Sequence, residues 1–194
     1  MRRGKLERTA YHEAGHTVMA YWLRKRIRYI TIVPNTDCQG HLRRGKNQDL
    51  HDAEYDRSPR TRSGIEKEVM VAFGGPVAEQ ILTGSRYYSK GSQGDAYKAA
   101  DFISYLVSGD KELGAYLKWL ETRTEAILNI PTVWQAVKAL ANELLARKHI
   151  GGKAARDIIQ DSMKGGDSIG ADSKQSQSTQ NKAKEVEHDS NSTR

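Results

Sequence analysis

The sequence is poor in cysteine and in long apolar runs. Cys38 is the single cysteine among 194 residues, which excludes an intramolecular disulfide and a cysteine-based zinc site; we expect its thiol in the core. No stretch approaches the roughly 20 apolar residues that cross a bilayer, and charged residues interrupt the N-terminal segment where a signal peptide would lie. From these absences we expect a cytoplasmic protein without a membrane span.

The sequence is basic, but it lacks a motif that reads nucleic-acid bases. The formal net charge is +7, and basic residues are dense at Arg24-Lys25-Arg26 and Arg43-Arg44. Such a distribution suits an acidic partner, whether a substrate or a nucleic acid. Because no helix-turn-helix, zinc finger or aromatic-interleaved strand pattern accompanies it, we interpret it as a solvated surface and expect no specific nucleic-acid partner.

Composition divides the chain into two parts. Residues 1–163 contain enough apolar residues for one domain with a core. Residues 164–194 are rich in Ser, Gln, Lys, Asp and Asn and have almost no large apolar side chain. Such a segment buries too little surface to offset the entropy of ordering it, so we expect a disordered polar tail.

Hydrophobic periodicity predicts helices joined to a small sheet. β-Branched and aromatic residues predict a strand over 28–33, and residues 40–43 suit a short edge strand. Residues 44–62 show no clear period and are expected to form a loop. Apolar residues at three- and four-residue steps predict helices over 6–23, 63–82, 95–107, 113–128, 131–147 and 154–163. The predicted fold class is α+β, predominantly helical, with a small sheet and a C-terminal helical bundle.

Gly74-Gly75-Pro76 interrupts the predicted helix over 63–82, whose start is indicated by a capping box at Ser63 and Glu66. Glycine costs about 1 kcal/mol relative to alanine inside a helix, and proline costs more. One interpretation is a simple break between two helices. The other is a close approach of this backbone to the helix over 6–23, which glycine permits.

His12-Glu13-Ala14-Gly15-His16 is the most informative motif in the chain. Histidines four residues apart lie one turn apart on the same helical face, so both rings can bind one Zn²⁺. Glu13 points about 100° away around the helix, where it can hold a water without competing as a ligand. The motif predicts metal-assisted hydrolysis, most often of a peptide bond. The alternative, a helical glutamate between two surface histidines, is disfavoured by the apolar stripe beside the motif.

A catalytic zinc needs a third protein ligand. Asp95 shares a predicted helical face with apolar residues, so we expect it to point inward, and an inward acid without a basic partner in its own segment needs a cation. Alternatively, Asp95 acts with Ser92 as a capping acid at a helix start. Glu79 is a weaker candidate for the third ligand, and His41 is the weakest of the candidates.

Several ordered motifs resemble the FtsH-type ATP-dependent zinc metalloproteases. Residues 9–16 (TAYHEAGH) are similar to the zinc-site helix of that family, and residues 30–34 (ITIVP) to the strand that follows it. Residues 73–79 (FGGPVAE) resemble its Gly-Gly-x-x-Ala-Glu helix, and residues 89–95 (SKGSQGD) the loop that ends in its ligand aspartate. Residues 139–152 look like its closing helices. The resemblance covers about residues 5–163.

This resemblance implies a zincin-like metallopeptidase helix within a mostly helical peptidase domain. It implies that Zn²⁺ is bound by His12, His16 and Asp95, and that Glu13 is the catalytic general base.

The resemblance also implies that extended substrate pairs with an edge strand of the domain, a form of β-augmentation. Gly40, His41 and Leu42 would carry this substrate-binding role here.

The sequence differs from that family in having no P-loop, Walker motif or membrane helix. We therefore expect a free-standing zinc-dependent metalloendopeptidase that cuts unfolded or flexible polypeptides and relies on any ATPase in trans. The alternative is a non-catalytic, zinc-stabilised interaction module or adaptor for an ATPase partner, which the intact Glu13 disfavours. The sequence does not specify the oligomeric state.

Overall fold

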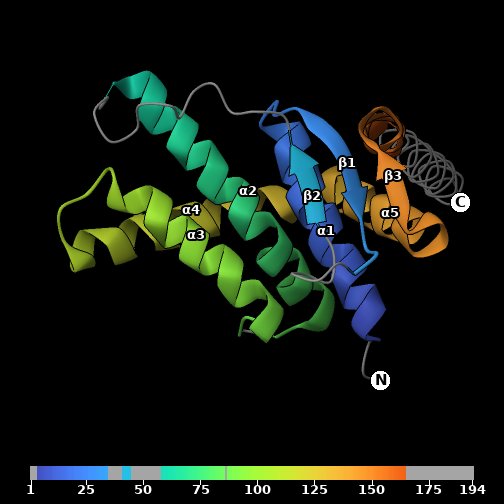
Figure 1. The fold of residues 1–194 in the computed structure, drawn as a ribbon, viewed down its shortest axis with the longest axis horizontal. Coiled ribbons are helices and arrows are strands. Elements are labelled where there is room, and N and C mark those ends of the chain that lie inside the picture. Colours follow the sequence, from blue (N-terminus) through green and yellow to red (C-terminus); the bar gives the residue numbers. More distant parts are fainter. Residues whose placement is uncertain (1–3, 35–40, 45–57, 86, 165–194) are drawn as a thin grey trace, which may run out of the picture.

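The computed structural model describes residues 4–34, 41–44, 58–85 and 87–164. Cys38 and the predicted tail after residue 164 lie outside this part of the chain. The elements follow in the order α1 (Lys5–Trp22), β1 (Ile27–Thr31), β2 (His41–Arg44), α2 (Pro59–Thr83), the 3₁₀ turn η2 (Lys90–Ser92), α3 (Gln93–Ser104), α4 (Asp110–Leu128), α5 (Pro131–Arg147), β3 (His149–Gly151) and a helical segment over residues 152–164. The fold is a predominantly helical α+β fold, as the sequence predicted (Figure 1). Among the described helices, none combines the length and apolarity needed to cross a bilayer.

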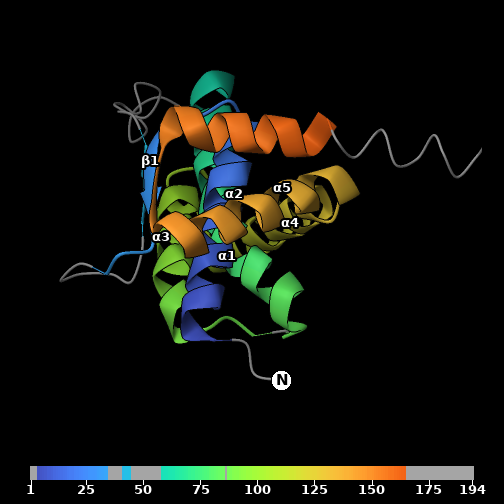
Figure 2. The same cartoon turned by 90° about the vertical axis from the view of Figure 1, so that its right-hand side faces the viewer.

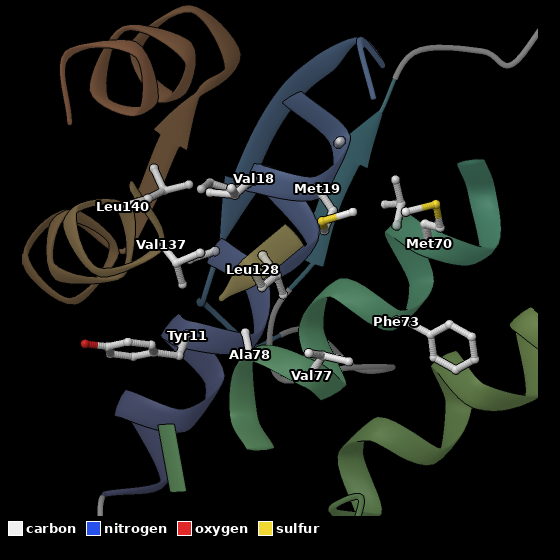
Figure 3. Packing of buried hydrophobic residues seen from close by; sticks show 14 of the residues in the cluster. Tyr11, Val18, Met19, Met70, Phe73, Val77, Ala78, Leu128, Val137 and Leu140 are labelled. Carbon is white, nitrogen blue, oxygen red and sulfur yellow. The ribbon is translucent and has the colours of Figure 1, made fainter. Parts of the chain in front are cut away.

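Helix α1 lies at the centre of the fold. Its residues 10–20 are all buried, because α2 and α5 pack along it and the sheet lies against a further side (Figures 1 and 2). Figure 3 shows Val18 on the side of α1 that faces Leu140 of α5, and Met19 on the side toward Met70 of α2. Burying an aliphatic side chain of this size contributes about 1.5–3 kcal/mol. The helix that carries the histidine motif is therefore held by the core from several directions.

The sheet has three antiparallel strands in the order β2-β1-β3. In the β1–β2 pair, Ile30 lies opposite Leu42 and Thr31 lies opposite His41. Strand β2 therefore occupies an edge of the sheet, as its sparse apolar content predicted.

Strand β3 lies between the helices predicted over 131–147 and 154–163, where no strand was predicted. Helix α5 ends at Arg147, as predicted, and the residue that caps it, Lys148, takes a left-handed conformation with φ of 62°. The Lys148 carbonyl then accepts a hydrogen bond from the backbone N–H of Ile32 at 2.9 Å, so the chain turns directly onto the sheet. Gly152 packs against this strand pair, since a Cβ there would lie 2.1 Å from the carbonyl oxygen of Ile27.

Helix α2 differs from the prediction at its start. The side chain of Ser58 accepts a hydrogen bond from the backbone N–H of Thr61 at 3.3 Å, and Pro59 fills the first helical position. Serine at the N-cap and proline next to it are a favourable helix start. The predicted capping box at Ser63 is therefore wrong, and the helix begins one turn earlier.

Helix α2 also runs through Gly74-Gly75-Pro76 without a break, so the interpretation as two helices is wrong. A Cβ on Gly15 would lie 2.2 Å from the carbonyl oxygen of Gly74, and one on Gly74 would lie 2.7 Å from that of Gly15. The main chains of α1 and α2 thus touch where the helices cross. This packing outweighs the one helical hydrogen bond that Pro76 cannot donate.

Candidate metal centre

Three atoms of the kind that bind metals meet beside α1. The Nε2 atom of His12 lies 2.9 Å from Nε2 of His16 and 3.1 Å from Oδ2 of Asp95, and Nε2 of His16 lies 3.4 Å from the same Oδ2. A tetrahedral zinc ion with bonds of about 2.0–2.1 Å holds its ligand atoms about 3.3–3.4 Å apart. The group therefore fits zinc in atom type, and it is close in spacing, since one edge matches and the other two are about 0.2–0.5 Å shorter.

The two histidines are held through their other ring nitrogens. Nδ1 of His12 lies 2.7 Å from Oε1 of Glu79, and Nδ1 of His16 lies 2.7 Å from the carbonyl oxygen of Val71. The carboxylate of Glu79 can only accept, so Nδ1 of His12 carries a hydrogen, and in the neutral ring Nε2 keeps its lone pair. Nδ1 of His16 also lies 3.3 Å from the backbone N–H of Gly75, but its shorter contact is with the Val71 carbonyl, an acceptor, which places a hydrogen on this Nδ1 as well. A metal-binding histidine usually has such an acceptor on its second nitrogen.

The three candidate ligand atoms are electron-rich and attract positive charge. Burial by itself lowers the pKa of His12, but hydrogen bonds to Asp95 and Glu79 and the charge of Glu13 raise it to about 9. Burial by itself raises the pKa of Asp95, but hydrogen bonds from His12 and His16 hold it far below its usual range. A divalent cation competes with the proton for the same Nε2 atom, so the cluster that attracts a proton also suits a metal ion.

Gly75 leaves open the space in front of both ligand nitrogens. A Cβ at this position would lie 2.5 Å from Nε2 of His16 and 2.7 Å from Nε2 of His12. Any larger residue would fill the volume toward which the ligand atoms converge. The cradle for a cation is thus formed by the backbone of α2 as well as by side chains.

Asp95 reaches the histidines from the first turn of α3, and its side chain is 15% exposed. Ser92 precedes α3 but makes no capping hydrogen bond, and its hydroxyl donates to Oε1 of Glu79 at 2.9 Å. The interpretation of Asp95 as a capping acid paired with Ser92 is therefore wrong. The expectation of no basic neighbour is also wrong, because Nζ of Lys98 lies 3.4 Å from Oδ1 of Asp95. This exposed lysine contacts the oxygen that is not shared with the histidines.

Glu79, considered as an alternative third ligand, contacts the opposite nitrogen of the His12 ring. Its Oε2 accepts a hydrogen bond from Arg8 at 2.8 Å. Burial by itself raises the pKa of Glu79, but hydrogen bonds from His12, Arg8 and Ser92 lower it to about 2. Glu79 is therefore an ionised acceptor behind His12, outside the group of three ligand atoms.

Sequence reasoning missed Arg8 and Ser92 as parts of this site. Arg8 precedes His12 by four residues and so lies on the same face of the helix, a spacing that could have drawn attention to it. Ser92 carried no comparable signal, because its contact with Glu79 joins residues of two different elements.

Glu13 is buried in α1, with 4% of its surface exposed. It follows His12 directly in the helix, and its charge contributes to the raised pKa of His12. The grouped ligand atoms come from His12, His16 and Asp95. The position of Glu13 beside this group suits a base, and that role stays a prediction.

The expected substrate-binding residues lie at the start of β2. Gly40 is outside the described residues, His41 opens the strand, and Leu42 is partly buried against the core. The side chain of His41 lies outside what the structure describes, so its candidacy as a ligand stays untested. The substrate role of these three residues stays a prediction.

Comparison with known proteins gives one consistent family. The sequence model of peptidase family M41 matches residues 1–114. The chain is 28% identical over 147 residues to the ATP-dependent zinc metalloprotease YME1L1 of Mus musculus, covering 73% of this chain and 20% of that protein. It is 32% identical over 114 residues to the ATP-dependent zinc metalloprotease FtsH of Mycoplasma mobile, covering 57% and 15%, and 37% identical over 101 residues to that of Pelobacter propionicus, covering 51% and 15%. The chain thus spans a fifth or less of the length of these relatives. By its sequence, the chain belongs to peptidase family M41.

Proposed function

We propose that this chain binds one Zn²⁺ through His12, His16 and Asp95 and acts as a metalloendopeptidase on unfolded or flexible polypeptides. The observation that carries the proposal is the triangle of two Nε2 atoms and one Oδ2 atom, with edges of 2.9, 3.1 and 3.4 Å. Membership of family M41 supports it, as do the names of the relatives, which describe zinc metalloproteases.

The residues around the centre have different roles in peptide hydrolysis. Zn²⁺ in this position would polarise the scissile carbonyl and acidify a water. Glu13 takes the proton of the attacking water at its carboxylate and passes it to the leaving amine. His12 and His16 keep their orientation throughout, because their Nδ1 hydrogens are donated to Glu79 and Val71.

We further propose that the substrate binds as an added strand along β2, at Gly40, His41 and Leu42. In the described sheet β2 has β1 on one side and no strand on the other. An open edge offers backbone N–H and C=O groups to any extended chain, whatever its side chains. This mode suits a peptidase that accepts many unfolded sequences.

We propose that these residues cut flexible chains without ATP, and that folded substrates must first be unfolded by an ATPase. The relatives are named as ATP-dependent, whereas these 194 residues contain no P-loop sequence.

The test is degradation of labelled casein, a flexible substrate, by the zinc-loaded full chain. We expect cleavage that a chelator abolishes and added Zn²⁺ restores, and no cleavage of a stably folded protein. A zinc-loaded chain that leaves casein intact would refute the peptidase proposal for this chain alone. The zinc-stabilised interaction module would then become the better account of the site.

A further inference from the structure

One carboxylate, that of Glu79, joins the elements that carry the ligands. Its Oε1 contacts Nδ1 of His12 at 2.7 Å and accepts a hydrogen bond from Ser92 at 2.9 Å, while its Oε2 accepts from Arg8 at 2.8 Å. Arg8 and His12 come from α1, Glu79 from α2, and Ser92 immediately precedes α3, which carries Asp95. The relative placement of the ligands therefore depends on how this carboxylate is held.

Arg8 holds the carboxylate from the outside. The Arg8 side chain is 41% exposed and that of Glu79 is 11% exposed, so the guanidinium covers a group that is otherwise buried. Arg8 and His12 lie one turn apart on the same helical face. Arg8 is hydrogen-bonded to Oε2 of Glu79, and His12 is hydrogen-bonded to Oε1. A charge-assisted hydrogen bond of this kind is short and directional. With Oε2 fixed by Arg8, Oε1 can turn neither away from His12 nor away from Ser92.

We propose that Arg8 is a positioning residue of the metal centre that acts through Glu79. By fixing Oε2 it keeps Oε1 against Nδ1 of His12, which aims Nε2 at the other two ligands. Ser92, bound to the same Oε1, ties the start of α3 to this arrangement and so brings Asp95 to the histidines. The inference rests on the proposed zinc site, and it does not require that the chain cleave peptides.

A purely structural role for Arg8 makes a different prediction. A partly exposed ion pair contributes little to stability on average, so loss of Arg8 would then leave both the fold and the metal affinity nearly unchanged. A positioning role predicts a fold that persists and a metal affinity that falls.

The test measures Zn²⁺ affinity of the full chain by competition with a chelator, together with the visible absorption of the Co²⁺-loaded protein, which reports ligand geometry. We expect Arg8→Gln to weaken Zn²⁺ binding about 10–100-fold, as for other outer-shell partners, and to change the Co²⁺ spectrum. Arg8→Lys keeps a cationic donor and should recover part of the affinity. Arg147→Gln is the matched control, because it removes a 2.7 Å arginine–carboxylate pair with Glu143 on α5 and should bind Zn²⁺ like the wild type.

A double-mutant cycle with Glu79→Gln tests the route of the effect. If Arg8 acts through Glu79, Arg8→Gln should cause no further loss of affinity once Glu79 is replaced. The inference is overturned if Arg8→Gln binds Zn²⁺ as tightly as the wild type, or if its effect is the same in both backgrounds. A wild type that binds no Zn²⁺ would instead refute the proposed metal site itself.

Discussion

Replacing Gly75 by alanine would place a methyl group 2.5 Å from Nε2 of His16 and 2.7 Å from Nε2 of His12, closer than such atoms approach without displacement. The two rings have little freedom to move aside, because Glu79 and Val71 hold their Nδ1 atoms at 2.7 Å. We predict that Gly75→Ala folds but loses its zinc.

The expected magnitudes for Gly75→Ala follow from two opposing effects. Overpacking typically costs about 1–3 kcal/mol, and alanine is better than glycine inside a helix by about 1 kcal/mol. The net loss of stability of the metal-free protein should therefore be about 0–2 kcal/mol. Zinc affinity should fall further than the about 10–100-fold typical of an outer-shell change, because the methyl group displaces the ligand atoms themselves.

The assay for Gly75→Ala combines zinc affinity by chelator competition with urea unfolding in chelator. Gly114→Ala is the matched control, since Gly114 lies within α4 and a Cβ there would meet nothing within 4 Å. The control should bind zinc like the wild type and gain about 1 kcal/mol of stability. Zinc binding by Gly75→Ala with unchanged affinity would show that the space in front of the histidines is not where the metal sits.

Three further predictions concern individual side chains. Glu13→Gln should keep its zinc and its melting temperature while casein cleavage falls about 10²–10⁴-fold, as for loss of a general base; loss of zinc in this variant would make Glu13 structural instead. Gly15→Ala should destabilise the protein by about 3 kcal/mol or more in urea unfolding, because its Cβ would meet the backbone oxygen of Gly74 at 2.2 Å; wild-type stability would contradict the observed helix crossing. In the metal-free protein the pKa of Glu79 is lowered from 4.5 to about 2, so its contribution to stability is complete above pH 4.5 and is lost as pH falls toward about 2. The free energy of unfolding should therefore decrease more steeply across that window in the wild type than in Glu79→Gln, and equal slopes would count against the ionised state.

Local sequence pattern was enough where a feature lies within one element. His12 and His16 belong to a single helix, so their spacing alone placed the two rings on one face. Helix α5 begins at Pro131 and ends at Arg147, as its apolar period and its proline predicted. Asp95 was singled out by the inward face of its own helix, and its ligand role was also implied by family resemblance.

Features set by contacts between distant segments could not be predicted in the same way. The local cost of Gly74-Gly75-Pro76 left open a break in the helix or a close approach to α1, and the contact with Gly15 shows that the close approach is correct and that the helix is continuous. The left-handed end of α5 is at Lys148, although glycine is the residue that usually signals such an end. Strand β3 has three residues and owes its conformation to pairing with β1, so its own sequence carries almost no strand signal.

The contact between Gly15 and Gly74 has a consequence for how the protein tolerates mutation. At this crossing the main chains of α1 and α2 are in direct contact, with the side chains of Ala78 and Met19 packed beside them. Substitutions that change the size of core side chains on the α5 side of α1, for example at Val137 or Leu140, therefore alter stability without changing the distance between the histidines and Gly75. Residues around α5 can be substituted in evolution, or by design for heat resistance, while the geometry of the candidate metal centre stays the same.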